Sequence, residues 1–239
     1  MAQIFYSLIY QPLFNLLIFL YDVIPFFDLG MAVIVLTLII KTILYPLGVK
    51  AARSQKEMEE IQPEVKKIQE KYKDDKEKQG KLIMELYKER KVNPFSGMLP
   101  LFVQLPVLIS LFQIFRRGLE VEEMKHLYSF ISAPEIVSYS FLGIVDLSSP
   151  NIVLAIIAAV GQYFQMKMTM VKKKEGGKQD TAKAIQSQMI YFLPGFTFMI
   201  LLNIPSVVGL YWVVTVVFSV FQQYIIKKEN KDGGDKKNN

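Results

Sequence analysis

The chain has 239 residues, of which 51% are apolar and 21% charged, and its mean hydropathy is +0.26. This composition excludes an ordinary soluble domain and a disordered chain, and it predicts an all-α polytopic membrane protein. The absence of cysteine excludes disulfides, thiolate nucleophiles and sulfur metal sites. The single histidine, His126, cannot supply a metal cluster or a catalytic triad.

The first 29 residues lack the basic start and the small-residue cleavage site of a signal peptide, so we expect them to stay on the mature protein. Aromatic residues recur through this segment, and Pro12 divides it. We therefore predict an interfacial helix from Pro12 to Val23 that lies along the membrane surface, with a true membrane span as the alternative.

The stretch from Gly30 to Ala52 is long enough to cross a bilayer and carries Lys41 among apolar residues. On a continuous helix the Lys41 Cα lies about 13 Å from Lys50, near mid-membrane. A cation that faces lipid there costs about 2.5 kcal/mol or more, so we expect Lys41 to face protein or a water-filled cavity. The alternative is a lysine that snorkels to the headgroups, which its reach of about 6 Å disfavours.

Thirteen Lys or Arg residues lie between Lys50 and Lys91, which places this loop in the cytoplasm by the positive-inside rule. Apolar residues at steps of three and four predict two helices packed along a narrow seam. The seam residues are Met58, Ile61, Val65, Ile68 and Tyr72 in the first helix, and Leu82, Ile83, Leu86 and Tyr87 in the second. Asp75 is expected to cap the second helix, and Pro63 to kink or restart the first. We predict an antiparallel hairpin with a docking or gating role, the alternative being a solvated spacer.

Four further apolar stretches bring the predicted spans to five, with the N-terminus outside and the C-terminus in the cytoplasm. The predicted division is 1–29 (interfacial helix), 30–50 (first span), 51–92 (cytoplasmic hairpin), 93–117 (second span), 118–149 (extracytoplasmic loop), 150–170 (third span), 171–183 (cytoplasmic loop), 184–202 (fourth span), 205–226 (fifth span) and 227–239 (disordered cytoplasmic tail). Short helices are expected near 120–132 and 134–140. Arg116 and Arg117 fall on the outer side, against the charge rule.

Phosphate-loop, zinc-protease and serine-hydrolase motifs are missing from the sequence, and the five predicted spans contain no Asp or Glu. These absences disfavour an enzyme and an ion-coupled transporter, and we predict no catalytic residue, metal or cofactor. The polar residues of the spans that we single out as candidates are Lys41, Thr37, Gln104, Gln162, Gln165, Thr197 and Thr215. We predict that they line a hydrated pocket of positive potential; for Gln104, helix-to-helix hydrogen bonding is an equal alternative.

Three stretches resemble the YidC-type membrane-protein insertases of bacterial inner membranes. They are LTLIIKTILYPLGVKAARSQKEMEEIQPEVKKIQEKYKDD, MELYKERKVNPFSGMLPLFVQLPVLISLF and MIYFLPGFTFMILLNIPSVVGLYWVVTVVFSVFQQYIIKK. The resemblance implies five transmembrane helices around a hydrophilic groove that is open to the cytosol and lipid and closed outside. In the family an arginine precedes Tyr-Pro-Leu on the first span; here Lys41 stands before Tyr45-Pro46-Leu47. The large extracytoplasmic domain of some relatives is not found in this sequence, which predicts a short form.

The leading hypothesis is an insertase that accepts nascent membrane proteins, with Tyr211 and Trp212 as further candidate contacts in the groove. Partition of the client's apolar helix into lipid drives release, at about 0.8 kcal/mol per buried CH₂. The Sec translocon and the ribosome are candidate partners, and no specific nucleic-acid site is expected. One alternative is a small-molecule or anion transporter that uses Lys41 as a counter-ion. Another is an assembly chaperone that binds the Sec translocon and does not insert clients alone.

Overall fold

The structure is a computed structural model that describes residues 2–23, 28–93, 99–119, 122–134, 137–169 and 181–235. The chain divides into two compact units. One unit joins Met1–Ile43 to Gln104–Asn239, and the other is Leu44–Val103. The two units differ in charge density, because the 60 residues of the second unit hold 23 of the chain's 50 charged residues.

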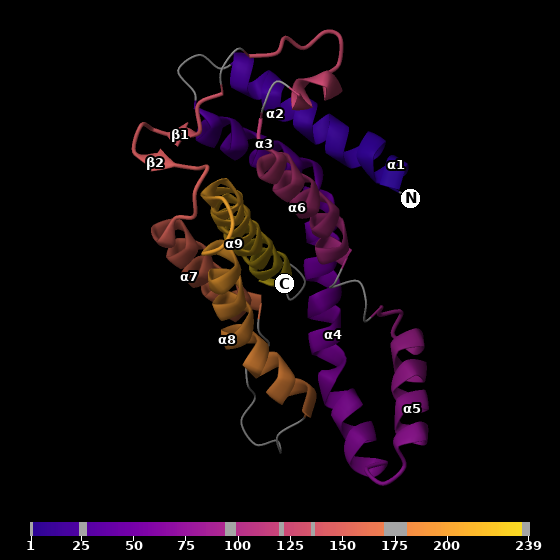
Figure 1. The fold of residues 1–239 in the computed structure, drawn as a ribbon. Coiled ribbons are helices and arrows are strands. Elements are labelled where there is room, and N and C mark those ends of the chain that lie inside the picture. Colours follow the sequence, from indigo (N-terminus) through magenta and orange to yellow (C-terminus); the bar gives the residue numbers. More distant parts are fainter. Residues whose placement is uncertain are drawn as a thin grey trace. The chain divides into compact units, whose positions relative to one another are not determined.

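The second unit contains a helical hairpin of α4 (Tyr45–Lys71) and α5 (Lys76–Glu89), which lie side by side (Figure 1). Ile61, Val65 and Leu86 are buried, so the predicted apolar seam is confirmed. Each helix buries one stripe against the other and leaves its remaining faces to water, as the spacing of the apolar residues requires.

Polar contacts fix the turn and the open end of this hairpin. The Asp75 carboxylate accepts a hydrogen bond from the Lys78 N–H at 3.0 Å, which confirms the predicted cap of α5. At the other end, Arg90 forms an ion pair with Glu64 at 2.6 Å between the two helices. The first helix does not restart at Pro63, because α4 runs through this residue as one element.

The N-terminal segment is one continuous helical run, in contrast to the predicted division at Pro12. It consists of α1 (Ala2–Phe5), the π-helical turn η1 (Tyr6–Tyr10) and α2 (Gln11–Val23). In the wider turn the Gln11 N–H donates to the Tyr6 carbonyl, five residues back. A proline ring clashes with the carbonyl four residues before it, and the π-turn gives the chain the extra residue that relieves this crowding.

The predicted first span is broken at Leu44, where the sequence suggested one continuous helix. α3 ends at Ile43 and α4 begins at Tyr45, with Pro46 in its first turn. Pro46 has no N–H to donate to the preceding turn, so the ladder of helical hydrogen bonds stops here. The break leaves Lys41 in the last turn of α3 (Leu29–Ile43) instead of the middle of a long helix.

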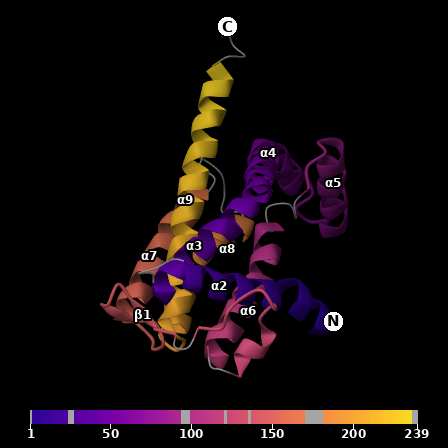
Figure 2. The same ribbon diagram turned by 90° about the horizontal axis from the view of Figure 1, so that it is seen from above.

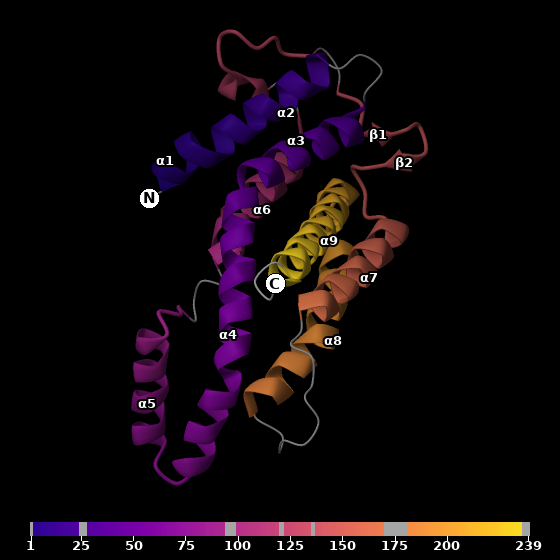
Figure 3. The same cartoon turned by 180° about the vertical axis from the view of Figure 1, so that it is seen from behind.

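Helices α7 (Ile152–Thr169), α8 (Thr181–Leu201) and α9 (Ser206–Asp235) form the main packing group of the first unit. α7 contacts both α8 and α9, and α3 packs on α9 (Figures 2 and 3). The approach of α7 to α9 is close at Gly161, where an added Cβ would lie 3.0 Å from the Val216 side chain. Small residues allow such approaches between membrane helices.

The loop that follows α6 (Leu99–Arg117) differs from the prediction of two short helices. Its described residues form the 3₁₀ turn η3 (Glu123–His126) and a two-stranded antiparallel hairpin of β1 (Ser140–Phe141) and β2 (Val145–Asp146). Residues 137–140 are therefore not helical, although a helix was expected near 134–140; residues 135 and 136 lie outside the described residues. Pairing with β2 decides the conformation of this part, and the local sequence pattern did not reveal that pairing.

The strand hairpin is fixed to the ends of α3 and α9. Asp28 accepts hydrogen bonds from the N–H of Met31, at the start of α3, and from the N–H of Leu142, in the turn of the hairpin. The Val207 N–H at the start of α9 donates to the Leu147 carbonyl at 3.2 Å.

Asp146 closes the turn that follows β2. Hydrogen bonds from the hydroxyl and the N–H of Ser148 hold the pKa of Asp146 below its usual value, because they stabilise the carboxylate.

Two helices among the described residues are long and apolar enough to cross a membrane, Gln3–Val23 and Ser206–Ile226. α3 joined to the start of α4 makes a third if the break is counted as a bend within one span. Shorter apolar helices cover Ile152–Met168 and Gln188–Leu201. The predicted class, an all-α polytopic membrane protein, is confirmed. The interfacial position of the first helix and the count of five spans stay predictions.

Candidate functional site

Lys41 projects from the last turn of α3 toward α9. Its side chain is half-buried, and its Nζ lies 5.9 Å from the centroid of the Phe218 ring. The carbonyls at the end of a helix favour a cation, and an aromatic face attracts one, so both neighbours suit the ammonium group. Among the residues that the structure describes, no carboxylate pairs with it. Its charge is therefore left for another partner.

Thr37 lies one helical turn before Lys41 and has no exposed surface. Its hydroxyl donates to the Val33 carbonyl at 2.6 Å, within the same helix. A hydroxyl that is bonded in this way belongs to the packing between helices, and in this structure it is not offered to a groove.

Gln104 on α6 and Tyr211 on α9 are brought together by the fold. The Gln104 side-chain N–H donates to the Tyr211 hydroxyl. Tyr211 is only 1% exposed, and its neighbour Trp212 is half-buried. Tyr211 therefore contributes to the site by its hydrogen bond with Gln104 and by its packing. The Trp212 side chain, in contrast, keeps part of its surface accessible.

We expect the contact between Gln104 and Tyr211 to couple the two residues energetically. In a double-mutant cycle of Gln104→Leu and Tyr211→Phe, the coupling should be about 0.6 kcal/mol, the average for hydrogen bonds between membrane helices. Equilibrium unfolding in mixed detergent micelles measures it. Strictly additive effects of the two substitutions would show that the contact does not stabilise the fold.

The face of α9 that contacts Lys41 and Gln104 carries Tyr211, Thr215 and Phe218, at the four- and three-residue spacing of one helical side. The Thr215 hydroxyl between them is buried and interacts with the Tyr211 hydroxyl, although not in the geometry of a full hydrogen bond. Buried polar atoms in proteins are nearly always paired with protein or water, so a water molecule or a polar group of a client is its expected hydrogen-bond partner.

Three more buried polar atoms lack a full hydrogen bond within the described part of the chain. They belong to Ser110, Gln162 and Gln223. Gln162 was predicted as a site residue, whereas Ser110 and Gln223 were not. Both lie in predicted spans, so their polar character was the available signal.

The remaining predicted site residues lie on α7 and α8. Gln165 is half-buried on α7, one turn after Gln162, and Thr197 on α8 is buried. α7 packs against both α8 and α9, so these residues lie in the same helix group as Tyr211. Lys41, Gln104 and Tyr211 make contacts that reach another helix of the site.

Comparison with known proteins decides the family. Residues 19–234 match the family model described as 60Kd inner membrane protein. The chain belongs to the 60Kd inner membrane protein family. Its relatives include proteins named membrane protein insertase YidC in Francisella philomiragia subsp. philomiragia, 34% identical over 199 residues, and in Francisella tularensis subsp. novicida and subsp. holarctica, both 33% identical over the same length. Each match covers 83% of this chain and 32% of the relative, so the chain spans about a third of the length of these proteins.

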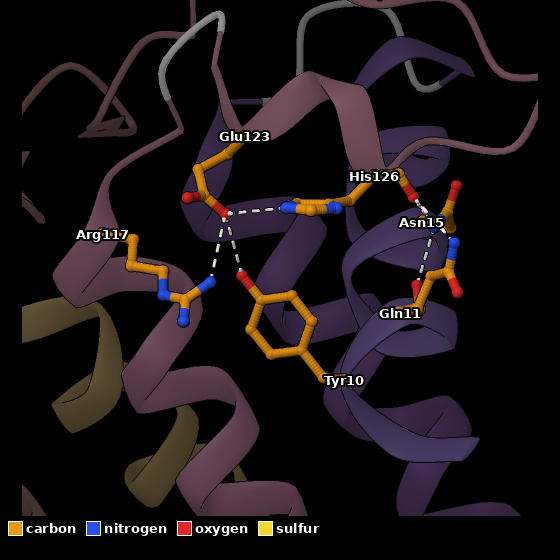
Figure 4. Close-up of polar contacts among 6 residues, drawn as sticks. All are labelled: Tyr10, Gln11, Asn15, Arg117, Glu123 and His126. Atoms are coloured by element: carbon orange, nitrogen blue, oxygen red, sulfur yellow. Dashed lines mark hydrogen bonds and ion pairs between the residues drawn. The ribbon is translucent and has the colours of Figure 1, made fainter. Parts of the chain in front are cut away.

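This member of the 60Kd inner membrane protein family also has a second group of polar residues that the sequence reasoning missed. Figure 4 shows Tyr10, Arg117 and His126 around the carboxylate of Glu123. The Tyr10 hydroxyl donates to Glu123 at 3.2 Å, and Arg117 and His126 approach the same oxygen at 3.7 and 3.9 Å. We call these four residues the Glu123 cluster.

Asn15 ties the N-terminal helix to the same loop. Its side-chain N–H₂ donates to the His126 carbonyl at 3.0 Å (Figure 4). Its side-chain oxygen accepts from the Tyr128 N–H at 2.6 Å. Asn15 is only 2% exposed. The amide side chain within an apolar helix was the signal that could have pointed to this contact.

Proposed function

We propose that the chain is a membrane-protein insertase whose clients are nascent membrane proteins. The observation that carries the proposal is Lys41, a half-buried cation at the end of α3 with no carboxylate partner among the described residues. Membership of the 60Kd inner membrane protein family supports it, because relatives in this family are named insertases. The chain carries out this task without catalysing a chemical reaction.

The proposed groove forms around Lys41 and the polar residues near it. Gln104, Gln162, Gln165, Thr197 and Thr215 provide the amides and hydroxyls, with Thr37 and Tyr211 as support and Trp212 as a client contact. The buried polar atoms of Thr215 and Gln162 need partners, which supports the presence of water in this region. A hydrated cation inside the membrane attracts acidic and polar segments of a client and shortens the apolar distance that they cross.

The direction of insertion follows from charge. The thirteen basic residues between Lys50 and Lys91 favour a cytoplasmic hairpin, an outer N-terminus and a cytoplasmic C-terminus. In this orientation α4 and α5 receive the client, and the Sec translocon or the ribosome delivers it. Partition of the client's apolar helix into lipid then drives release, at about 0.8 kcal/mol per buried CH₂ and without a nucleotide.

Reconstitution tests the proposal. The purified chain is placed in liposomes without Sec proteins and given a short single-span client with an acidic N-terminal tail. We expect the tail to become protected from added protease, because its carboxylates cross the membrane through the Lys41 region. Insertion that requires added Sec components would instead support an assembly chaperone. Solute uptake without any client, with no protected tail, would support a transporter.

A further inference from the structure

The insertase proposal leaves the arginine pair after α6 unexplained. Arg116 and Arg117 fall on the outer side in the proposed orientation, where the charge rule disfavours them. Arg117 lines a pocket of about 390 Å³ together with Gln3, Phe5, Tyr6, Tyr10 and Gln113. The pocket lies between the N-terminal helix and α6, within the first unit.

The walls of this pocket are aromatic. Tyr6 and Tyr10 stack with their ring centroids 5.3 Å apart, and the Arg117 guanidinium carbon lies 5.6 Å from the Tyr10 centroid. Both tyrosines belong to the π-helical turn η1, a feature that is frequent at functional sites. Gln3 and Gln113 add two amide groups to the lining.

Arg117 lines the pocket, and Glu123 lies next to this lining, where its carboxylate accepts a hydrogen bond from the Tyr10 hydroxyl. The Arg117 guanidinium and the Glu123 carboxylate approach each other at 3.7 Å, which is too long for a direct hydrogen bond (Figure 4). Glu123 is largely covered, with 19% of its side chain exposed, whereas the Arg117 side chain is 52% exposed. A simple anion would be repelled by Glu123 and a simple cation by Arg117. A ligand that carries both charges satisfies the two side chains together.

We propose that this pocket binds the headgroup of a zwitterionic phospholipid that has a primary amine, such as phosphatidylethanolamine. The phosphate contacts Arg117 and the amides of Gln3 and Gln113, and the ammonium group contacts Glu123 and the tyrosine faces. The same helical segment exposes Ile4 and Leu8, 63% and 71% respectively, which lipid tails cover. The assignment of the lipid to the outer leaflet rests on the orientation in the proposed function. The existence of the pocket does not depend on that orientation.

The experiment measures lipid binding to the full chain in detergent by native mass spectrometry. Phosphatidylethanolamine and phosphatidylglycerol with identical short acyl chains are the probes. We expect the wild type to prefer phosphatidylethanolamine and Arg117→Gln to weaken that binding about tenfold, as the loss of one charge-assisted contact implies. Glu123→Gln should reverse the preference, because it removes the partner of the ammonium group and leaves Arg117 unopposed.

Arg116→Gln is the matched control, since Arg116 lies over Phe112 and does not line the pocket. It should leave both affinities unchanged. If Arg117→Gln fails to fold, Arg117→Lys replaces it and should weaken binding less than tenfold, because the charge remains and the planar fork is lost.

Equal binding of the two lipids with no effect of Glu123→Gln would overturn the proposal. So would an Arg116→Gln defect as large as that of Arg117→Gln, or free phosphoethanolamine that binds as tightly as the lipid. The assay needs no client, so its result is independent of insertion. A chain that does not insert proteins can still show the predicted lipid preference, and an active insertase can lack it.

Discussion

Replacing Lys41 with glutamate is expected to reduce client insertion at least tenfold. The substitution puts a negative charge beside the terminal carbonyls of α3 and the Phe218 ring, both of which repel it. It also turns the attraction between position 41 and acidic client segments into repulsion. For charges within a few ångströms of each other, this changes the interaction energy by well over ~1.4 kcal/mol. Lys41→Arg keeps the charge and should retain activity, with Lys41→Ala between the two. Growth rescue in cells depleted of their own insertase, together with protease protection of a client tail, measures the effect.

Lys167→Glu is the matched control for this substitution. Lys167 is an exposed lysine near the end of α7, and its Nζ lies 5.7 Å from the centroid of the Tyr163 ring. It has the same charge and a similar aromatic contact, but it is not a proposed site residue. We expect it to keep near wild-type insertion. Rescue by Lys41→Glu equal to that of the wild type would eliminate charge attraction as the mechanism, although not the fold.

Gly30→Ala is expected to destabilise the first unit by about 1–3 kcal/mol, the usual range for overpacking. Gly30 lies in the first turn of α3, and an added Cβ would overlap the Phe141 side chain of β1, including its Cβ. The strand hairpin would have to move, and the contact between Leu142 and Asp28 would move with it. Equilibrium unfolding in mixed detergent micelles measures the loss.

Gly195→Ala is the control, because a Cβ at this helical position meets no atom within 4 Å. It should be neutral or slightly stabilising, since alanine is the better helix former. Combination of Gly30→Ala with Phe141→Ala should recover part of the loss, because it removes the ring that overlaps the new methyl group. A Gly30→Ala protein as stable as the wild type would contradict the close packing of β1 on α3.

The hairpin could be predicted from the sequence because its determinants are local. The apolar stripe that includes Ile61 and Val65 specifies one buried side of α4, and Asp75 specifies where α5 begins. Both signals lie within a few residues of the element that they determine. The membrane class could also be predicted from the sequence, because it depends on the total apolar content.

The break at Leu44 and the π-turn before Pro12 were missed for a common reason. A proline can divide a helix, be accommodated within it or start a new one, and its neighbours decide which outcome occurs. Pro12 was expected to divide its helix and is accommodated, whereas Pro46 lies at a break that was not expected. As a consequence, Lys41 lies in the last turn of α3 and not in the middle of a long helix.

The contacts of Tyr10 with Glu123 and of Phe141 with Gly30 join residues more than 100 positions apart. Amphipathic periodicity carries no information about such pairs, so the strand hairpin and the pocket beside Arg117 could not be predicted from it. Among the predicted site residues, the sequence identified polar atoms in apolar helices. It could not tell that the hydroxyl of Thr37 bonds within its own helix, or that Gln104 contacts Tyr211.

The most direct test of the hydrated Lys41 region is the reaction of a single introduced cysteine with a membrane-impermeant maleimide added from the cytoplasmic side. The chain has no cysteine of its own, so Lys41→Cys gives a unique reactive group. Leu38→Cys is the comparison, since Leu38 is 42% exposed on the same helix and faces lipid in this account. We predict that Lys41→Cys is labelled much faster than Leu38→Cys. Equal or slower labelling at position 41 would contradict the account.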